Sequence, residues 1–214
     1  MGTIKQGILG GFNGKVGTVI GSSWKGITYM RSRAQHVKNP RTAGQVYSRT
    51  AFKAVSAALS PIASTLRLTF AKSAGKMSAF NKAVSENYKV ALVNQDGTPV
   101  VDYSKLILPK GTLTPFDYLN IDDISENGHY YLSVVNNDSS QVDYEGLIFF
   151  IYDPADDTWF TGVVKQHFHT GETLQFNSGM PLDSSKEYLA FACAYDPATC
   201  QVSNPIAEVE AIGG

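Results

Sequence analysis

Two histidines and one glutamate are the side chains in this sequence best suited to holding a metal ion. His167 and His169 are two residues apart in a β-rich stretch, so both would project from one face of a strand, and Glu172 follows closely. Imidazole and carboxylate groups are zinc ligands, but a zinc site uses three or four protein ligands in a fixed geometry. Histidines at a strand edge are more often simply solvated. We therefore keep His167, His169 and Glu172 as weak metal candidates and expect no metal and no cofactor.

The motifs of common enzyme classes are incomplete. Gly14-Lys15 lacks the rest of a phosphate-binding loop, because Leu9 stands where a glycine is needed and Val16 where Ser or Thr is needed. None of the serines lies in the Gly-x-Ser-x-Gly setting of a hydrolase nucleophile. The acids at residues 122–126 and 153–157 lack the ligand spacing of a calcium loop and are better explained as turn formers. We expect that the protein is not an enzyme.

The cysteines and the start of the chain bear on the compartment. Two cysteines in 214 residues are too few for a disulfide framework, which favours a reducing compartment. Cys193 alternates with Leu189 and Phe191, so we expect a buried free thiol there and favour it over a disulfide with Cys200. The opening residues lack the apolar core of a signal peptide, and no apolar run reaches the roughly 18 residues of a membrane helix. We expect a protein made in the cytoplasm, without a signal peptide and without contact with a membrane.

The charge of the chain is divided into two halves of opposite sign. Residues 1–95 hold fourteen of the 18 Lys and Arg residues and a single acid, Glu86. Residues 96–214 hold four lysines and the other eighteen of the 19 acids, so the net charge of -1 hides the division. The change of sign near Asp96-Gly97 predicts a basic domain over residues 1–95 and an acidic domain over residues 96–214.

The basic domain is predicted to begin with a glycine-rich β-hairpin. Over residues 15–20 and again over 24–31, the residue types alternate as expected for the two faces of a strand. Gly21-Ser22-Ser23 between them has the composition of a turn. Glycine inside a strand marks the close approach of another backbone, and a lone hairpin is marginal in water. We therefore expect the hairpin to add to another sheet, in this chain or in a neighbouring copy.

Two or three helices are predicted after the hairpin. Asn39-Pro40 and a capping box over residues 42–45 mark the start of the first helix. Pro61 should kink this helix or begin a second one, because proline lacks a backbone donor. A further helix is predicted over residues 78–89. The apolar stripe at helical spacing consists of Ala51, Phe52, Val55, Ala58, Leu59, Ile62 and Leu66.

The acidic domain is predicted to be an antiparallel β-sandwich of the immunoglobulin-like class. Its β-rich runs are separated by turn signals such as Asn127-Gly128, Asp153-Pro154 and Asp196-Pro197. The runs cover residues 100–108, 130–135, 146–152, 158–165, 172–177, 187–195 and 201–212. The fold class expected for the whole chain is α+β, with a hairpin and helices followed by the sandwich.

Six residues of the basic domain form the candidate interaction site. They are Trp24, Lys25, Tyr29 and Arg31 in the predicted hairpin, and Arg41 and Arg49 at the predicted helix. Cationic residues interleaved with aromatic ones also suit nucleic acid, through phosphate contacts and base stacking. No helix-turn-helix or zinc signature accompanies them, and the acidic half would repel a polyanion.

Four motifs near the start of the chain carry a resemblance to a known family. They are Ile4-Lys5-Gln6-Gly7-Ile8-Leu9-Gly10-Gly11-Phe12, Gly14-Lys15-Val16-Gly17, Gly21-Ser22-Ser23-Trp24-Lys25-Gly26 and Asn39-Pro40-Arg41-Thr42. With them the chain resembles an uncharacterised bacterial family of domains of unknown function with a glycine-rich N-terminus. The resemblance implies no activity and no functional residues. More loosely, residues 39–52 are similar to a stretch of phage and prophage structural proteins, which implies a virion component.

The division of charge favours an assembly protein over a nucleic-acid-binding one. Surfaces of opposite sign on one chain, arranged head to tail, generate rings or filaments. Such an arrangement explains both halves, whereas nucleic acid explains only the basic half. We expect a structural protein, as in a phage tail or ring, whose partners are other copies of itself and further virion proteins. A polyanion-binding module is the alternative, and pairing of the two halves within one molecule also stays open.

Overall fold

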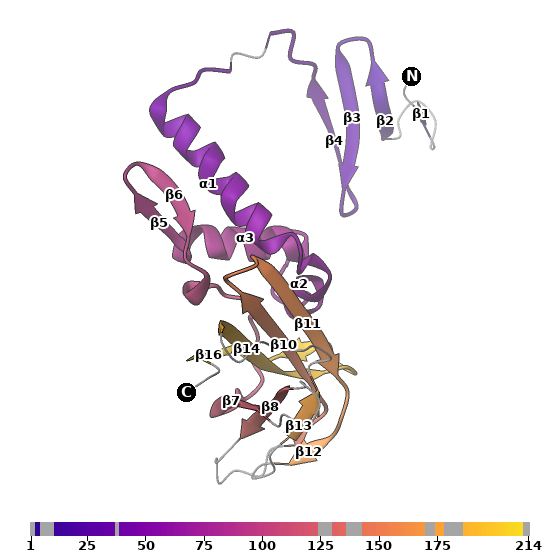
Figure 1. Cartoon of the computed structure of the whole chain (residues 1–214). Helices are drawn as coiled ribbons and strands as arrows, with labels where there is room; N and C mark the ends of the chain where they lie inside the picture. Colours follow the sequence, from indigo (N-terminus) through magenta and orange to yellow (C-terminus); the bar gives the residue numbers. More distant parts are fainter. Residues whose placement is uncertain are drawn as a thin grey trace. The chain divides into compact units, whose positions relative to one another are not determined.

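The computed structural model describes residues 3–4, 11–36, 39–123, 130–135, 143–169, 174–177 and 186–211. These residues combine α-helices with antiparallel sheets, which confirms the α+β class (Figure 1). They divide into two compact units, Met1–Gln45 and Val46–Gly214, and each unit is described by itself. The domain boundary predicted between residues 95 and 96 lies inside the second unit.

The first unit is a small antiparallel sheet with the strand order β1-β2-β3-β4 (Figure 1). Its strands are β1 Thr3–Ile4, β2 Phe12–Val16, β3 Val19–Trp24 and β4 Ile27–Ser32. Strands β2, β3 and β4 follow one another through two tight turns, so the sheet contains two consecutive hairpins where the sequence predicted one.

The turn predicted at Gly21-Ser22-Ser23 is wrong, because these residues lie within β3. The chain instead turns at Gly17-Thr18 and at Lys25-Gly26. Gly17 has a φ of 58°, and Lys25 and Gly26 have φ values of 47° and 82°. Two-residue hairpin turns need positive φ angles, which glycine adopts without steric cost. The positions of the turns therefore follow from the backbone dihedral angles that they require. The polar composition of Gly21-Ser22-Ser23 was not a guide to them.

Three helices follow: α1 Ala43–Leu59, α2 Ala63–Thr69 and α3 Ala79–Val90. Pro61 lies between α1 and α2, as its missing backbone donor predicts. The Ser78 side chain caps α3 by accepting a hydrogen bond from the backbone N–H of Asn81 at 3.2 Å. Over the described residues, none of the helices combines the length and the apolar character that a membrane span requires.

The buried stripe of α1 is narrower than the sequence predicted. Ala51, Val55, Ala58 and Leu59 are buried, but Phe52 is 58% exposed. Each residue of a helix is rotated by roughly 100° from the one before it, so Phe52 falls beside the stripe that Ala51 occupies. The assignment of Phe52 to the core was therefore wrong.

The second unit is organised around β10, Leu147–Asp153, in which every residue is buried. This strand pairs on one side with β11, Thr158–Val164, and on the other with β14, Glu187–Asp196. The short strands β15 Gln201–Val202 and β16 Ile206–Ala211 both pair with β14 and complete a five-stranded sheet. An unbroken apolar run of this length is typical of a strand that is covered on both faces.

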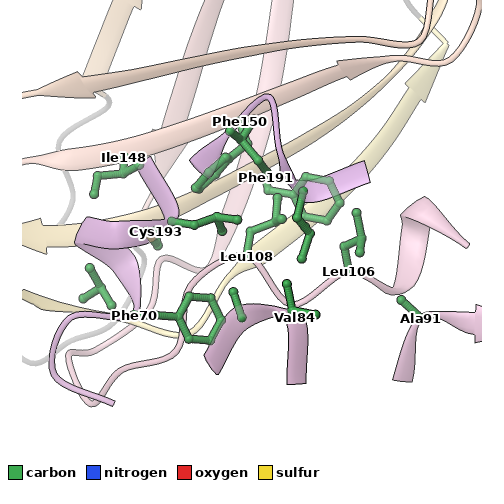
Figure 2. Close-up of a cluster of buried hydrophobic side chains, with 14 of the residues drawn as sticks. Phe70, Val84, Ala91, Leu106, Leu108, Ile148, Phe150, Phe191 and Cys193 are labelled. Atoms are coloured by element: carbon green, nitrogen blue, oxygen red, sulfur yellow. The ribbon is translucent and has the colours of Figure 1, made fainter. Parts of the chain in front are cut away.

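Each face of β10 packs against a different hydrophobic cluster. On one face, Ile148 and Phe150 join a cluster that includes the helix residues Leu59, Leu66 and Val84 (Figure 2). On the other face, Leu147, Phe149 and Ile151 join a cluster with Phe116, Tyr144 and Phe168. The helices and this sheet therefore share one hydrophobic core, although the charge of the chain changes sign between them. The immunoglobulin-like sandwich stays a prediction.

The remaining strands form smaller antiparallel groups. β5 Leu92–Gln95 pairs with β6 Thr98–Val101, and β9 Asp143–Tyr144 pairs with β12 Phe168–His169. A three-stranded sheet has the order β13-β8-β7, with the bounds Leu174–Asn177, Tyr130–Val135 and Tyr118–Asp123.

The strand predicted over residues 100–108 ends early. β6 stops at Val101, and a 3-10 helix, Tyr103–Lys105, follows it. The Asp102 carboxylate accepts hydrogen bonds from the Ser104 backbone N–H at 3.2 Å and from the Ser104 hydroxyl at 2.6 Å. Such local side-chain bonds compete with strand pairing, and here they turn the chain.

Two loops of the second unit share one sequence and one structure. Tyr152-Asp153-Pro154-Ala155 follows from β10, and Tyr195-Asp196-Pro197-Ala198 follows from β14. In both loops the aspartate Oδ1 accepts hydrogen bonds from the backbone N–H groups two and three residues later. The fifth residue counted from the aspartate, Asp157 or Cys200, has a φ of 50° or 53°. These contacts confirm the turn-forming role predicted for the acids at 153–157.

Candidate interaction surfaces

The first unit presents an aromatic and cationic face. Residues that pair across antiparallel strands project from the same face of the sheet. The pairs on one face of β3 and β4 are Ile20 with Arg31, Ser22 with Tyr29, and Trp24 with Ile27. Three of the predicted interaction residues, Trp24, Tyr29 and Arg31, therefore share this face, and Lys25 lies in the turn beside Trp24.

Both faces of this sheet carry exposed apolar side chains. On the face of Tyr29, which is 44% exposed, Ile27 is 58% exposed. On the opposite face, Val16 is 53% and Met30 is 68% exposed. Large apolar side chains are thus left toward solvent on the two sides of the sheet.

Gly21 is the one buried residue among residues 11–36. The backbone of β2 covers it, because a Cβ at Gly21 would meet the Phe12 carbonyl oxygen at 2.0 Å. This burial reflects the close approach of the β2 backbone and of the Phe12 ring, whose Cδ2 would lie 2.7 Å from such a Cβ. Over residues 11–36 the sheet therefore lacks a hydrophobic core of its own.

Strand β4 lies at the edge of this sheet. Among the residues of the first unit that the structure describes, β4 pairs with β3 alone. An edge strand offers backbone donors and acceptors on its outer side, to which a further strand can add. A strand added there would also meet the exposed side chains of Ile27, Tyr29 and Met30.

The two remaining predicted interaction residues lie in different units. Arg41 precedes α1 and belongs to Met1–Gln45, whereas Arg49 lies on α1 within Val46–Gly214. Both side chains are exposed. Five of the six predicted residues thus belong to the first unit and one to the second.

An apolar groove that the sequence did not predict lies between α1 and α3. Its volume is ≈ 420 Å³, and its walls include Phe52, Met77, Val84 and Tyr88. The groove was not predicted because Phe52, which lines it, was assigned to the buried stripe. Helical spacing alone cannot distinguish a core residue from one that lines a groove beside the core.

His167 meets a carboxylate that the sequence analysis did not single out. Its Nδ1 lies 3.3 Å from Oε1 of Glu145. His169 is opposite Asp143 in the register of β12 and β9. Glu172 and the side chain of His169 lie outside the described residues. Within the part of the chain that the structure describes, no group of three His, Cys, Asp or Glu side chains is placed to hold a metal ion.

Glu86, the acid of the basic half, is held by lysines from both halves. Its Oε1 lies 2.6 Å from Nζ of Lys82, and its Oε2 lies 3.2 Å from Nζ of Lys110. Hydrogen bonds from these two lysines lower the pKa of Glu86 to about 2. The two halves of the sequence thus meet through the pair of Glu86 and Lys110. Glu86 is an acid in the basic half, and Lys110 is a lysine in the acidic half.

The two cysteines are free thiols in different surroundings. Cys193 is buried on β14, as its alternation with apolar residues predicted, and Cys200 is exposed in a loop. Burial raises the pKa of the Cys193 thiol, which keeps it protonated and unreactive.

Comparison with known proteins places the chain in a family without a known activity. A sequence model described as a family of unknown function (DUF6266) matches residues 11–206. The matched range extends over most of both units. No curated protein matches the chain. The resemblance to an uncharacterised domain family is confirmed, and the resemblance to phage proteins stays a prediction.

Proposed function

Because the chain belongs to the DUF6266 family of unknown function, which supplies no activity, we propose a role from the sheet of the first unit. The protein is a structural protein that self-associates through strands β2, β3 and β4. The observation that carries this proposal is the exposure of apolar side chains on both faces of that sheet, with Gly21 alone buried among residues 11–36. A sheet of this size is marginal in water unless a hydrophobic face is covered.

The proposed contact has two parts. A strand of a neighbouring copy adds to the edge of β4 through backbone hydrogen bonds, and its side chains cover Ile27 and Tyr29. The opposite charges of residues 1–95 and 96–214 then favour a head-to-tail arrangement, in which the basic region of one copy meets the acidic region of the next. Closed rings and open filaments are both compatible with this arrangement. A place in a phage virion, with other virion proteins as partners, extends the proposal and rests on sequence resemblance alone.

The test is the mass of full-length protein measured by light scattering over a range of concentrations. We expect the wild-type chain to form oligomers, and the double variant Ile27→Ser/Tyr29→Ser to shift toward monomers. Val163→Ser is the matched control, because Val163 is also an exposed apolar strand residue, at 37%, but lies on β11 of the second unit. A wild-type chain that stays monomeric at every concentration contradicts the proposal, as does an equal loss of mass in the control.

A polyanion-binding module is the second candidate. The observation that favours it is the common face of Trp24, Tyr29 and Arg31, where base stacking and a phosphate contact could occur together. Anisotropy of a labelled single-stranded oligonucleotide, titrated at several salt concentrations, tests this candidate. Arg31→Ala should lower the slope of log affinity against log salt by about one. The absence of binding at low salt would remove it.

A further inference from the structure

Three aromatic rings and one carboxylate meet on the second unit, and the proposed function uses none of them. Tyr103 comes from the 3-10 helix, Tyr152 from β10 and Trp159 from β11. The rings of Tyr103 and Tyr152 stack with centroids 4.0 Å apart and planes 5° apart. The Trp159 ring lies 4.9 Å from Tyr152 and 6.1 Å from Tyr103.

Asp157 closes this cluster on its polar side. Its Oδ1 accepts a hydrogen bond from the Tyr152 hydroxyl at 2.9 Å and another from the Tyr103 hydroxyl at 3.3 Å. Burial raises the pKa of both tyrosines, and the nearby Asp157 charge raises it further, so the phenols stay protonated as donors. The two phenols therefore orient the carboxylate through one of its oxygens.

The other acids of the same loop have a cationic partner, and Asp157 differs from them. Nζ of Lys186 lies 3.1 Å from Asp153 and 2.5 Å from Asp156. The described contacts of Asp157 go to the two phenols, and within the described ranges no Lys or Arg pairs with it. The Oδ2 atom is thus left to accept a further hydrogen bond.

A groove opens beside this carboxylate. Its volume is ≈ 330 Å³, within the range of about 300–1,000 Å³ that is usual for small ligands. Asp157, Tyr103 and Trp159 line it at one side. The rest of its wall is apolar and comes from α1, the α1–α2 connection and β6: Ala54, Ala57, Ala58, Pro61, Pro99, Val100 and Val101. All of these residues belong to the second unit.

We propose that this groove binds an organic cation, an ammonium or guanidinium group carried on a short apolar stem. The cation donates to Oδ2 of Asp157 and lies near the electron-rich faces of the Tyr103 or Trp159 rings, where cation–π attraction adds to the charge-assisted hydrogen bond. The stem lies along Pro61 and Val100. A neutral N–H donor could still form a hydrogen bond with this oxygen but would lack the attraction between opposite charges and the cation–π attraction, and an anion would be repelled.

Two sources carry this chemistry: a free alkylamine, or a Lys or Arg side chain of another copy. The basic residues 1–95 provide such side chains in number. The inference does not depend on the proposed function, because the groove and the sheet lie in different units. Separate variants therefore test them separately.

Fluorescence of Trp159 reports binding directly. The chain has two tryptophans, so Trp24→Phe leaves Trp159 as the sole tryptophan, which is excited selectively over the tyrosines at the red edge of the absorption band. In this background the full-length protein is titrated with 1-butylguanidinium and with 1-butylurea, its neutral analogue of the same shape. We expect a saturable change with the cation and a much weaker response to the urea.

Asp157→Asn separates the charge of the carboxylate from its shape. Asparagine tolerates the φ of 50° at this position and can still accept from the phenols. We expect Asp157→Asn to weaken butylguanidinium binding by about ten-fold or more. The control Asp156→Asn removes the same charge one residue away and should change the affinity by less than about two-fold. Equal affinity of wild type and Asp157→Asn, equal binding of the urea, or no saturable change overturns the proposal.

The source of the cation follows from light scattering. If butylguanidinium dissociates wild-type oligomers and Asp157→Asn lowers their mass, the natural occupant is a side chain of another copy. If neither affects the mass while the fluorescence titration succeeds, the natural occupant is a free amine. Both results support the site.

Discussion

The sheet of the first unit and the sheet around β10 differ in what covers them. Every residue of β10 is buried, because helices cover one of its faces and an aromatic cluster covers the other. Every residue of β4 is exposed. Both sheets consist of antiparallel, hydrogen-bonded strands, so they differ in burial and not in the kind of strand pairing. The second unit therefore buries a hydrophobic core of its own, whereas residues 11–36 of the first unit bury Gly21 alone, which is the reason for proposing a partner there.

The sequences of the two central strands already differ in this sense. β10 begins with six large aliphatic or aromatic residues in succession, 147–152, and β3 has Gly21-Ser22-Ser23 in its middle. Small residues bring neighbouring backbones close but bury little apolar area. A strand of that composition would bury little apolar area even if another layer covered it. Four substitutions test this difference, given in order of their expected effect on the free energy of unfolding.

The largest effect is expected from Phe150→Ala. Phe150 is fully buried on β10, and truncation of such a ring costs about 3–5 kcal/mol through lost burial and the cavity left behind. Urea denaturation followed by circular dichroism measures the loss. A change below about 1 kcal/mol would mean that the β10 sheet is not the stable part of the molecule.

Asn87→Ala should follow, because Asn87 links α3 to the chain beyond the 3-10 helix. Its side-chain amide donates to the Ile107 carbonyl at 2.8 Å and accepts from the Ile107 N–H at 2.7 Å. Loss of these buried bonds should cost roughly 1–3 kcal/mol in the same urea titration. Asn94→Ala, on the exposed part of β5, is the control and should change little.

A smaller, pH-dependent effect is expected from Glu86→Gln. The pKa of Glu86 is lowered from 4.5 to about 2 in the folded protein, so its stabilising contribution is present above pH 4.5. The contribution is lost as the pH falls from 4.5 toward 2, because over that interval the unfolded chain binds a proton that the folded carboxylate does not yet bind. Wild type should exceed the variant by up to about 1 kcal/mol at pH 7, given that Lys82 and Lys110 are partly exposed. The difference should vanish near pH 2; a constant difference would assign the effect to packing.

The smallest effect on unfolding is expected from Tyr29→Ala. Because Tyr29 is already exposed, its removal should change the unfolding free energy of the second unit by less than about 0.5 kcal/mol. The same variant should lower the oligomer mass in light scattering. If Tyr29→Ala instead destabilised the protein as much as Phe150→Ala, the comparison between the sheets would fail.

Helical and buried-strand positions could be predicted from the sequence. Pro61 fixed the break between α1 and α2, and Ser78 fixed the start of α3, because each acts through its own local chemistry. The long apolar runs gave β10 and β14 with bounds near those of the structure. Local rules were sufficient wherever the determining group and its effect lay within a few residues.

The features that were predicted wrongly from the sequence depend on partners distant in the chain or on backbone dihedral angles. The second hairpin turn lies at Lys25-Gly26, because these residues adopt the positive φ angles that such a turn needs. Phe52 lines a groove because α3 forms the opposite wall. The shared core of helices and strands is also invisible in a charge count. Asp153-Pro154 and Asp196-Pro197 each predict a turn, and the repeat of Tyr-Asp-Pro-Ala, which the prediction did not use, also indicates that the two turns are alike. The cluster around Asp157 arises after one of them, but its partner Tyr103 is distant in sequence.

Because Cys193 is buried and Cys200 is exposed, the rate at which each thiol reacts reports on opening of the sheet. An alkylating reagent should label the exposed Cys200 at once, and it should reach Cys193 only when β14 separates from its neighbours. The delay between the first and second labelled thiol therefore times the opening of the central sheet, without any added probe.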